Sequence, residues 1–360
     1  MLLEAQNEKL FHEAAGGMPI AEFEGQPGPS GEEKMKSVCI VGAGAIGGLL
    51  GTRIAATGVP VSALARGATL QALRRHGWRL RTAGGLQKAP AKASANAAEL
   101  GVQDLVIIAV KGPSLPALAP AIAPLLGPGS VVLPAMNGVP WWFCQGRPGF
   151  EAPLRSVDPE GAIGRAISFP SVLGCVVHAS ASVLEPGLVE HRVGRGLIVG
   201  EPAGGRSARA KAVCDLLDRA GFEATHSSDI RYDIWYKLWG NMTMNPVSAI
   251  TGATIDRVLG DPLVRAFCSA AMLEAAQVGR AIGCDITQDA EDRHAITAKL
   301  GAFKTSMLQD VEAGRPIELD ALVGAVHEIA RHVGIATPSV DALFGLARLF
   351  GKMHGLYPPR

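Results

Sequence analysis

The chain has 360 residues, of which 48% are hydrophobic and 19% are charged, and its formal net charge is +1. Such a content of apolar residues can build a large core in more than one domain. The balance of charge, without a long basic run, excludes the electrostatic pattern of a protein that binds nucleic acid or an anionic membrane, so we expect a small molecule as the partner.

Residues 1–34 mix Glu, Lys, Gly and Pro and hold no apolar stretch of the kind that signal peptides contain. We expect a disordered leader over residues 1–35, with Met35 as an alternative start. The apolar segments are much shorter than the roughly 20 residues that span a bilayer. The six cysteines are scattered, without metal-ligand spacing. These features predict a cytoplasmic protein with buried free thiols and no metal site.

From Val38 onwards, apolar runs alternate with helical patterns. Continuous runs of about 5 to 7 apolar residues are typical of parallel strands covered on both faces. Such runs occur in VCIV, VPVSALAR, DLVIIAVK and SVVLPAMNG. The segments GCVVHASASVLEPGLVEHRV and GLIVGEP predict further antiparallel strands of the same sheet. A helical segment, RSARAKAVCDLLDRAGF, and a short strand, EATHSS, complete a dinucleotide-binding domain of the Rossmann type over residues 36–228.

After residue 228 the strand patterns stop, and helical patterns separated by Gly or Pro follow one another. The predicted helices cover residues 229–250, 261–283, 287–313, 317–334 and 338–352. The predicted fold class is therefore α/β. It combines an N-terminal Rossmann-type doubly wound sheet with an all-helical C-terminal domain over residues 229–360.

A glycine motif follows the first strand and opens a helix. It comprises Gly42, Ala43, Gly44, Ala45, Ile46 and Gly47. In this context the first glycine permits a tight turn, the second lets the backbone approach a pyrophosphate, and the third allows close packing of helix on sheet. Amides of the helix N-terminus can then bind the phosphates. The motif predicts a dinucleotide site, and the alternative is a tight turn without a ligand.

The ends of three strands carry candidate cofactor residues. Arg66 ends the second strand, where an NAD site usually offers an acid to the ribose 2′-hydroxyl. A guanidinium suits a 2′-phosphate, so Arg66 favours NADP(H), unless it is only a surface arginine. Lys111 and Asn137 follow two later strands and are predicted to border the nicotinamide end of the groove. A loop lysine and an Asn-Gly turn explain the same residues without a ligand.

One face of the predicted helix 229–250 carries Lys237, Asn241, Asn245 and Ser248 between large apolar residues. Asparagine is a poor helix former, so helix propensity does not explain why it recurs. Buried polar groups need partners, and a polar ligand would provide them. The alternative is an internal hydrogen-bond network in which Lys237 reaches the edge of the protein.

Two polar residues further along the chain complete the set of candidates. Ser306 is predicted in the middle of a helix, and Glu318 in the first turn of the next helix, after a Gly-Arg-Pro turn. Capping is the local explanation of Glu318, because the positive end of a helix dipole favours a carboxylate.

From Met35 to about residue 350 the chain resembles the ketopantoate reductase (2-dehydropantoate 2-reductase) family. The matching stretches are IVGAGAIG, the strand-end Arg66, AVK, MNG, IWYKLWGNMTMNPVSAITG, KTSMLQDVEAGRPIELDALVGAV and GIATPSVDALF. The resemblance implies NADPH-dependent reduction of ketopantoate to pantoate on the route to pantothenate, in a cleft between the two domains. The alternatives are a reductase of a different 2-keto acid with the same fold, and a non-catalytic NADP(H)-binding sensor.

The resemblance also implies roles for single residues. Lys237 would donate the proton, and Glu318 would contact the substrate hydroxyl and Lys237. The residues that would bind substrate are Asn137, Asn241, Asn245 and Ser306. Those that would contact the cofactor are the glycine motif, Arg66, Lys111 and Asn137. A fixed ammonium group suits this chemistry, because hydride arriving at a ketone carbon leaves negative charge on the oxygen.

Two features depart from the family pattern. The segment TGATIDRVL lacks the additional substrate asparagine that members often carry after the Asn-Pro pair. An aromatic insertion, PWWFCQGRPGF, occupies residues 140–150 and either walls the pocket or packs against the second domain.

The sequence does not determine the oligomeric state, and a homodimer is one of the states it allows.

Overall fold

The computed structural model describes residues 35–357, so the leader predicted for residues 1–35 lies outside the described residues except for Met35. The chain divides into two compact units, each made of three segments. The first unit comprises the chain up to Val110, Ala117–Met136 and Ala166–Ile230. The second comprises Lys111–Pro116, Asn137–Arg165 and the chain from Arg231 onwards. Two segments that follow strands of the first unit therefore group with the helices of the second.

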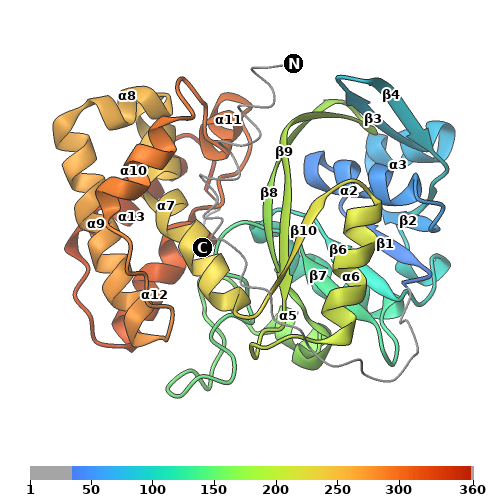
Figure 1. Cartoon of the computed structure of the whole chain (residues 1–360), viewed down its shortest axis with the longest axis horizontal. Helices are drawn as coiled ribbons and strands as arrows, with labels where there is room; N and C mark the ends of the chain where they lie inside the picture. Colours follow the sequence, from blue (N-terminus) through green and yellow to red (C-terminus); the bar gives the residue numbers. More distant parts are fainter. Residues whose placement is uncertain (1–34, 358–360) are drawn as a thin grey trace, which may run out of the picture. The chain divides into compact units, whose positions relative to one another are not determined.

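The first unit contains a parallel sheet with the strand order β5-β2-β1-β6-β7 (Figure 1). Its strands are β1 (Val38–Val41), β2 (Val61–Leu64), β5 (Lys92–Ser94), β6 (Leu105–Ile108) and β7 (Val131–Pro134). Every residue of β1 and β6 is buried, which explains their continuous apolar sequences. Because β1 pairs with β2 on one side and with β6 on the other, the strand order reverses between β1 and β6. Doubly wound sheets bind their ligands at such a point.

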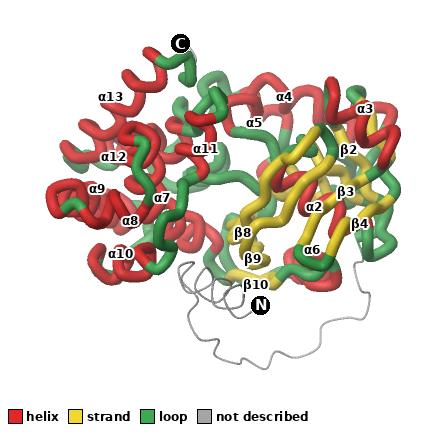
Figure 2. The backbone as a smooth tube through the Cα atoms, turned by 90° about the horizontal axis from the view of Figure 1, so that it is seen from above, coloured by secondary structure: helices red, strands yellow, loops and turns green. Residues whose placement is uncertain are grey.

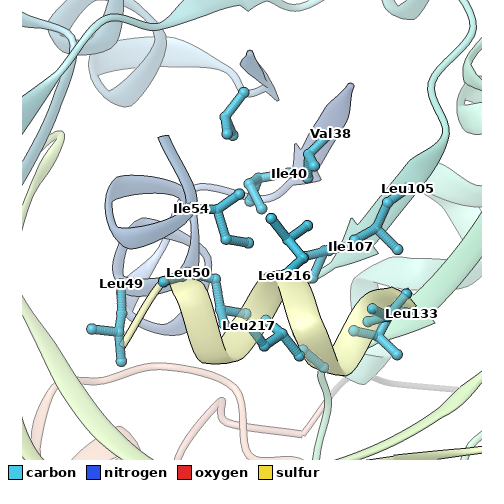
Figure 3. Packing of buried hydrophobic residues seen from close by; sticks show 14 of the residues in the cluster. Val38, Ile40, Leu49, Leu50, Ile54, Leu105, Ile107, Leu133, Leu216 and Leu217 are labelled. Carbon is cyan, nitrogen blue, oxygen red and sulfur yellow. The ribbon is translucent and has the colours of Figure 1, made fainter. Parts of the chain in front are cut away.

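Helices connect strands of this sheet, and one further helix, α6 (Ala208–Arg219), joins the same core. They are α2 (Ala45–Ala55), α3 (Gly67–His76), α4 (Leu115–Ile122) and α6, with short 3-10 segments η1 (Ala97–Glu99), η2 (Gly112–Ser114), η3 (Ala123–Leu125) and η4 (Phe169–Ser171). Figure 3 shows the core that results, in which Ile40 of β1, Ile54 of α2 and Leu216 of α6 belong to one apolar cluster. All three side chains are fully buried.

The strands after β7 build a second sheet, so the prediction that they extend the first sheet is wrong. β8 (Gly174–Glu185) and β9 (Leu188–Gly200) form the predicted antiparallel pair. The order of their sheet is β10-β9-β3-β4, with β8 on the other edge of β9. β10 (Glu223–Ser227) pairs with the end of β9, and β3 (Trp78–Thr82) pairs with its beginning. β4 (Gly85–Ala89) forms a hairpin with β3 that the sequence analysis did not predict.

Helix α2 packs against strands of both sheets, as Figures 1 and 2 show. Two of its glycines make the second contact close. A β-carbon at Gly48 would lie 2.4 Å from a methyl of Val189, and one at Gly51 would lie 2.6 Å from the Trp78 ring. Gly48 and Gly51 therefore allow α2 to pack closely against strands of the second sheet.

The second unit is helical, and the predicted fold class is confirmed. Its helices are α7 (Ile230–Thr251), α8 (Ile255–Gly260), α9 (Pro262–Ala281), α10 (Ala290–Ala298), α11 (Ser306–Glu312), α12 (Ala325–His332) and α13 (Pro338–Met353). A short helix, α5 (Ala162–Ala166), precedes β8, and a π-helical turn, η5 (Asp320–Gly324), leads into α12. Helices α10, α12 and α13 pack on α9 (Figure 1).

The predicted helix 287–313 is wrong, because the chain forms two helices, α10 and α11, with a turn between them. Gly301 lies in this turn with a φ of 62°. The carbonyls of Gly301 and Phe303 accept hydrogen bonds from the first amides of α8. The turn thus satisfies donors that a continuous helix would leave without partners. Ser306 consequently begins α11 and does not lie in the middle of a helix.

The predicted helix 317–334 also begins later than expected. Ile317 and Glu318 precede the helical residues, and the helix opens with the π-helical turn η5. The Ile317 amide donates to the Leu356 carbonyl at 3.0 Å, in the segment that follows α13. Glu318 therefore does not cap a helix, contrary to the local explanation of this residue.

The aromatic insertion at residues 140–150 packs within the second unit. Trp142 and Phe143 are fully buried, and the Phe143 ring stacks on Trp235 of α7 with ring centroids 5.8 Å apart. The six cysteines all lie among the described residues, where they are buried and form no disulfide, as predicted. Over the part of the chain that the structure describes, none of the helices has the length and apolar character needed to cross a membrane.

Candidate active site

The glycine motif forms the turn between β1 and α2 in the first unit. Gly42 has a φ of 91°, and a β-carbon there would lie 2.5 Å from a methyl of Val110, just after β6. A β-carbon at Gly44 would meet open space, whereas one at Gly47 would lie 2.0 Å from the Gly42 carbonyl oxygen. The turn therefore requires glycine at its first and third positions and leaves room above the second.

Helix α2 offers its first amides without competition from its own side chains. Its N-cap is Gly44, and no acidic residue lies in its first turn. The other residues of the glycine motif, Ala43, Ala45 and Ile46, carry only small or apolar side chains. A diphosphate could bind to such amides, since the positive end of the helix dipole favours anions.

Arg66 lies two residues after β2 and is the N-cap residue of α3. It is exposed, and the first turn of α3 also lacks an acidic side chain. A guanidinium at a helix N-terminus combines two features that attract a phosphate group. The structure therefore places the glycine motif and Arg66 after adjacent strands, β1 and β2, of the same sheet.

Lys237 and Asn137 meet in the second unit, although 100 residues separate them in the sequence. The ammonium nitrogen Nζ of Lys237, on α7, donates a hydrogen bond to Asn137 Oδ1 at 2.9 Å. Both side chains are partly buried. The two candidates from separate sequence motifs therefore form one polar pair.

The backbone after Asn137 is held by the π-helical turn η5. Gly138 has a φ of 81°, and a β-carbon there would lie 2.5 Å from the carbonyl oxygen of Ala321. The same oxygen accepts a hydrogen bond from the Val139 amide at 2.8 Å. Single π-helical turns occur frequently at functional sites. Here the turn fixes the strand-end loop that carries Asn137.

Glu318 is the acidic member of this site. Its Oε1 accepts a hydrogen bond from the Gly112 amide at 3.0 Å. Burial raises the pKa of the Glu318 carboxyl above its usual value, while the Gly112 bond and the charges of Lys111 and Lys237 act in the opposite direction. The negative charge of Asp310 adds to the rise. A carboxyl in these surroundings holds a proton more readily than an exposed one does.

Lys111 is engaged in the second unit. Its ammonium group forms an ion pair with Asp310, and Nζ also donates to the Pro316 carbonyl at 3.3 Å. Arg315 Nε donates to the other oxygen of Asp310 at 3.0 Å. The sequence analysis missed Asp310. The signal was its position four residues after Ser306, on the same face of α11.

The other polar residues on this face of α7 differ in their burial and partners. Asn245 is buried, and its amide nitrogen lies 3.5 Å from the hydroxyl oxygen of Ser306. Asn241 is partly buried and lies between Lys237 and Asn245 along the helix. Ser248 is fully buried and donates to the Ala253 carbonyl at 2.6 Å. Ser248 therefore has a backbone partner just after the end of α7.

The site can bind and protonate a small polar molecule. It combines an ammonium group, carboxamides, a hydroxyl and a carboxyl of raised pKa within one unit. Among residues 35–357 we find no group of three or more His, Cys, Asp or Glu side chains that could hold a metal ion.

Comparisons with known proteins assign the chain to a family. The model of ketopantoate reductase PanE/ApbA matches residues 38–204, and the model of its C-terminal part matches residues 229–350. A 2-dehydropantoate 2-reductase from Mesorhizobium japonicum is 43% identical over 323 residues, which cover 89% of this chain and 99% of the relative.

Solved structures agree with this assignment. A protein from Ralstonia solanacearum MolK2, assigned as a ketopantoate reductase, is 54% identical, with a TM-score of 0.87 over 90% of this chain and 100% of its own. D-mandelate dehydrogenase with NADH and anilino(oxo)acetate shares the fold at 22% identity, with a TM-score of 0.75 over 89% of this chain and 99% of its own. The chain belongs to the ketopantoate reductase family and is an oxidoreductase, as its sequence predicted.

We predict that Gly138→Ala destabilises the protein more than Gly146→Ala does. Both glycines have positive φ, at 81° and 78°, so alanine costs about 1–2 kcal/mol at either position. Only the β-carbon at position 138 would also meet a carbonyl oxygen, whereas the one at 146 meets open space. Thermal unfolding of the two variants measures the difference. Equal melting temperatures would show that η5 does not constrain the loop of Asn137.

Proposed function

We propose that this protein reduces ketopantoate to pantoate with NADPH and that Lys237 is the proton donor. The observation that carries the proposal is the hydrogen bond between Lys237 Nζ and Asn137 Oδ1, with Glu318 close enough for its pKa to respond to the ammonium charge. A keto acid needs such a donor at its carbonyl oxygen. On this proposal the enzyme works in the cytoplasm, on the route to pantothenate.

Lys237 would act on the carbonyl oxygen of the substrate. Bound NADPH would supply the hydride that adds to the keto carbon. As the carbonyl becomes an alkoxide, the ammonium of Lys237 stabilises the negative charge and gives up one proton to the oxygen. The hydroxyl of the product forms, and the neutral amine takes a proton from water. Asn137 holds one N–H of the ammonium group, which orients the others.

Glu318 would help to position Lys237 and the substrate hydroxyl. Its carboxyl is fixed by the Gly112 amide, and its charge would favour the ammonium form of Lys237 before the reaction. It would also accept a hydrogen bond from the substrate hydroxyl. Burial, which raises the pKa of this carboxyl, would make it a better proton acceptor than an exposed glutamate.

The remainder of the α7 face would bind the substrate. Eight residues separate Lys237 from Asn245, or about 12 Å along a helix that rises 1.5 Å per residue. Asn241 lies between them, and Ser306 lies beside Asn245. Amide N–H and hydroxyl groups at these positions would donate to the carboxylate and hydroxyls of the keto acid.

The first unit would bind the cofactor through residues already described. The amides of α2 would hold the diphosphate, and Arg66 would hold the 2′-phosphate that distinguishes NADPH from NADH. Lys111 would help to set the nicotinamide end of the site through its ion pair with Asp310.

A second candidate function is the reduction of a different 2-keto acid. It is favoured by the absence of a further asparagine in TGATIDRVL after the Asn-Pro pair. D-mandelate dehydrogenase shows that the fold also accommodates an aromatic 2-keto acid analogue. A non-catalytic sensor is less well supported, because Lys237, Asn241 and Glu318 are all present.

A panel of 2-keto acids tests the proposed substrate. We expect NADPH oxidation, measured by absorbance, to show the highest kcat/KM with ketopantoate, because its hydroxyl and carboxylate match the donors of α7 and Ser306. A higher kcat/KM with another member of the panel would establish the second candidate function. Cofactor binding without turnover of any 2-keto acid would favour the sensor.

Substitution of Lys237 by alanine tests the proton donor. We expect kcat to fall by roughly 10²- to 10⁴-fold, the usual contribution of a general acid, while the Kd for NADPH stays constant. Lys352→Ala is the control, because Lys352 is an exposed lysine of the same unit on α13. Wild-type turnover in Lys237→Ala would remove the lysine from the mechanism.

Substitution of Arg66 by alanine tests the choice of cofactor. We expect the KM for NADPH to rise roughly 10- to 100-fold, because a charge-assisted contact to the 2′-phosphate is lost, and the KM for NADH to change little. The control is Arg75→Ala, which removes an exposed guanidinium from the other end of α3. A preference for NADH in the wild type, or one for NADPH that survives in Arg66→Ala, would contradict the assignment.

A further inference from the structure

The last described residues fold back onto the segment that carries Glu318. Helix α13 ends at Met353, and Gly355, with a φ of 68°, reverses the chain. Leu356 and Tyr357 are then buried, each with 5% of its surface exposed. Their amides donate to the Gly351 carbonyl at 2.7 and 3.1 Å. We name residues 355–357 the C-terminal clamp.

The clamp holds both sides of Glu318. On one side, the Leu356 carbonyl accepts a hydrogen bond from the Ile317 amide at 3.0 Å. On the other side, the Tyr357 hydroxyl donates to Asp320 Oδ1 at 2.6 Å. Ile317 and Leu319, the neighbours of Glu318, are buried at 2% and 0% exposure. The main chain at Glu318 is therefore fixed from both directions.

Close packing leaves this arrangement little freedom. A β-carbon at Gly351 would lie 2.9 Å from Cβ of Tyr357 and 3.1 Å from Cδ1 of Ile317. Tyr357 and Ile317 therefore both lie close to Gly351 and leave no room for a larger residue there. A side chain at position 351 would displace one or both of them.

The same contacts reach Asn137 through the π-helical turn. Asp320, the acceptor of the Tyr357 hydroxyl, is the first residue of η5. Its neighbour Ala321 binds the Val139 amide and blocks any side chain at position 138. Hydrogen bonds and short backbone links thus connect the clamp with Glu318 and with the partner of Lys237.

We propose that the C-terminal clamp is a positioning element of the reductase site and that Tyr357 is its positioning residue. Tyr357 acts through Asp320, which sets the start of η5 and with it the places of Glu318 and Asn137. The inference rests on the proposed function, in which those two side chains act on the substrate.

Loosening of the C-terminal clamp would change the pH dependence of the reaction rate through Glu318. Glu318 faces three charged groups, Lys111, Lys237 and Asp310, and Asp310 is in turn paired with Arg315. Burial is the largest cause of the raised pKa of Glu318. A looser segment admits water and moves this pKa down towards its usual value. A limb of the pH–rate profile that belongs to Glu318 therefore moves to lower pH.

The test is Tyr357→Phe, which removes one hydroxyl and keeps the ring. We expect faster hydrogen exchange at the amides of Ile317 and Val139, and kcat lower by roughly tenfold, the effect of one charge-assisted hydrogen bond. The KM for NADPH should stay constant, and the Glu318 limb should move to lower pH. The control is Tyr236→Phe, which removes a hydroxyl bound to Gln288 Oε1 at the same distance of 2.6 Å.

A second pair of variants separates positioning from general loss of structure. Asp320→Asn keeps an oxygen acceptor for the Tyr357 hydroxyl and should retain most of kcat, whereas Asp320→Ala should behave like Tyr357→Phe. Unchanged exchange at Ile317 and Val139 in Tyr357→Phe would overturn the inference. The inference would also be overturned if exchange at these amides became faster while kcat and the pH profile stayed as in the wild type. Exchange is measured without substrate, so a wild type that turns over no 2-keto acid would count only against the proposed function.

Discussion

The hydrogen bond between Lys237 and Asn137 is the contact on which the arrangement of the site depends. It requires an ammonium group on a largely apolar helix to stay in place while partly withdrawn from water. Withdrawal from water disfavours a charge unless polar groups replace the solvent. Asn137 Oδ1 is one replacement, and the carboxyl of Glu318 is another. The helix face, the strand-end loop and the turn η5 all serve to keep these groups together.

The site also places three cations, Lys111, Lys237 and Arg315, near two acids, Asp310 and Glu318. Lys111 is paired with Asp310, and Lys237 lies near Glu318, whose pKa burial raises. The two acids therefore have different surroundings. Asp310 binds Lys111 and Arg315 directly, whereas Glu318 accepts one amide hydrogen bond and responds to the lysines only through their charges. A pair of acids in unequal surroundings can divide the tasks of fixing a cation and of exchanging a proton.

The sequence was sufficient for features that depend on local residue patterns. The glycine motif, the buried parallel strands and the polar face of α7 each follow from neighbouring residues, and the structure contains all three. The second sheet was not predictable in the same way, because its hairpin β3-β4 pairs with a strand more than a hundred residues later. Ser248 has the spacing of the polar face but bonds to a backbone carbonyl, which spacing does not reveal. Ser306 and Glu318 were placed in the wrong local structure, since distant backbone groups determine where α11 and η5 begin.

Lys111 and Asn137 show why strand ends alone do not locate a site. Each follows a strand of the parallel sheet, which suggested the edge where such sheets bind a cofactor. Their segments nevertheless group with the helical unit, and their recorded polar contacts are with Asp310, Pro316 and Lys237. Two strands of the parallel sheet are thus followed by segments that belong to the helical unit. Backbone contacts to η5 and to Glu318 fix the segments that carry Asn137 and Lys111. On the function that we propose, this would let Lys237 and its neighbours stabilise a developing alkoxide without rearranging during the reaction.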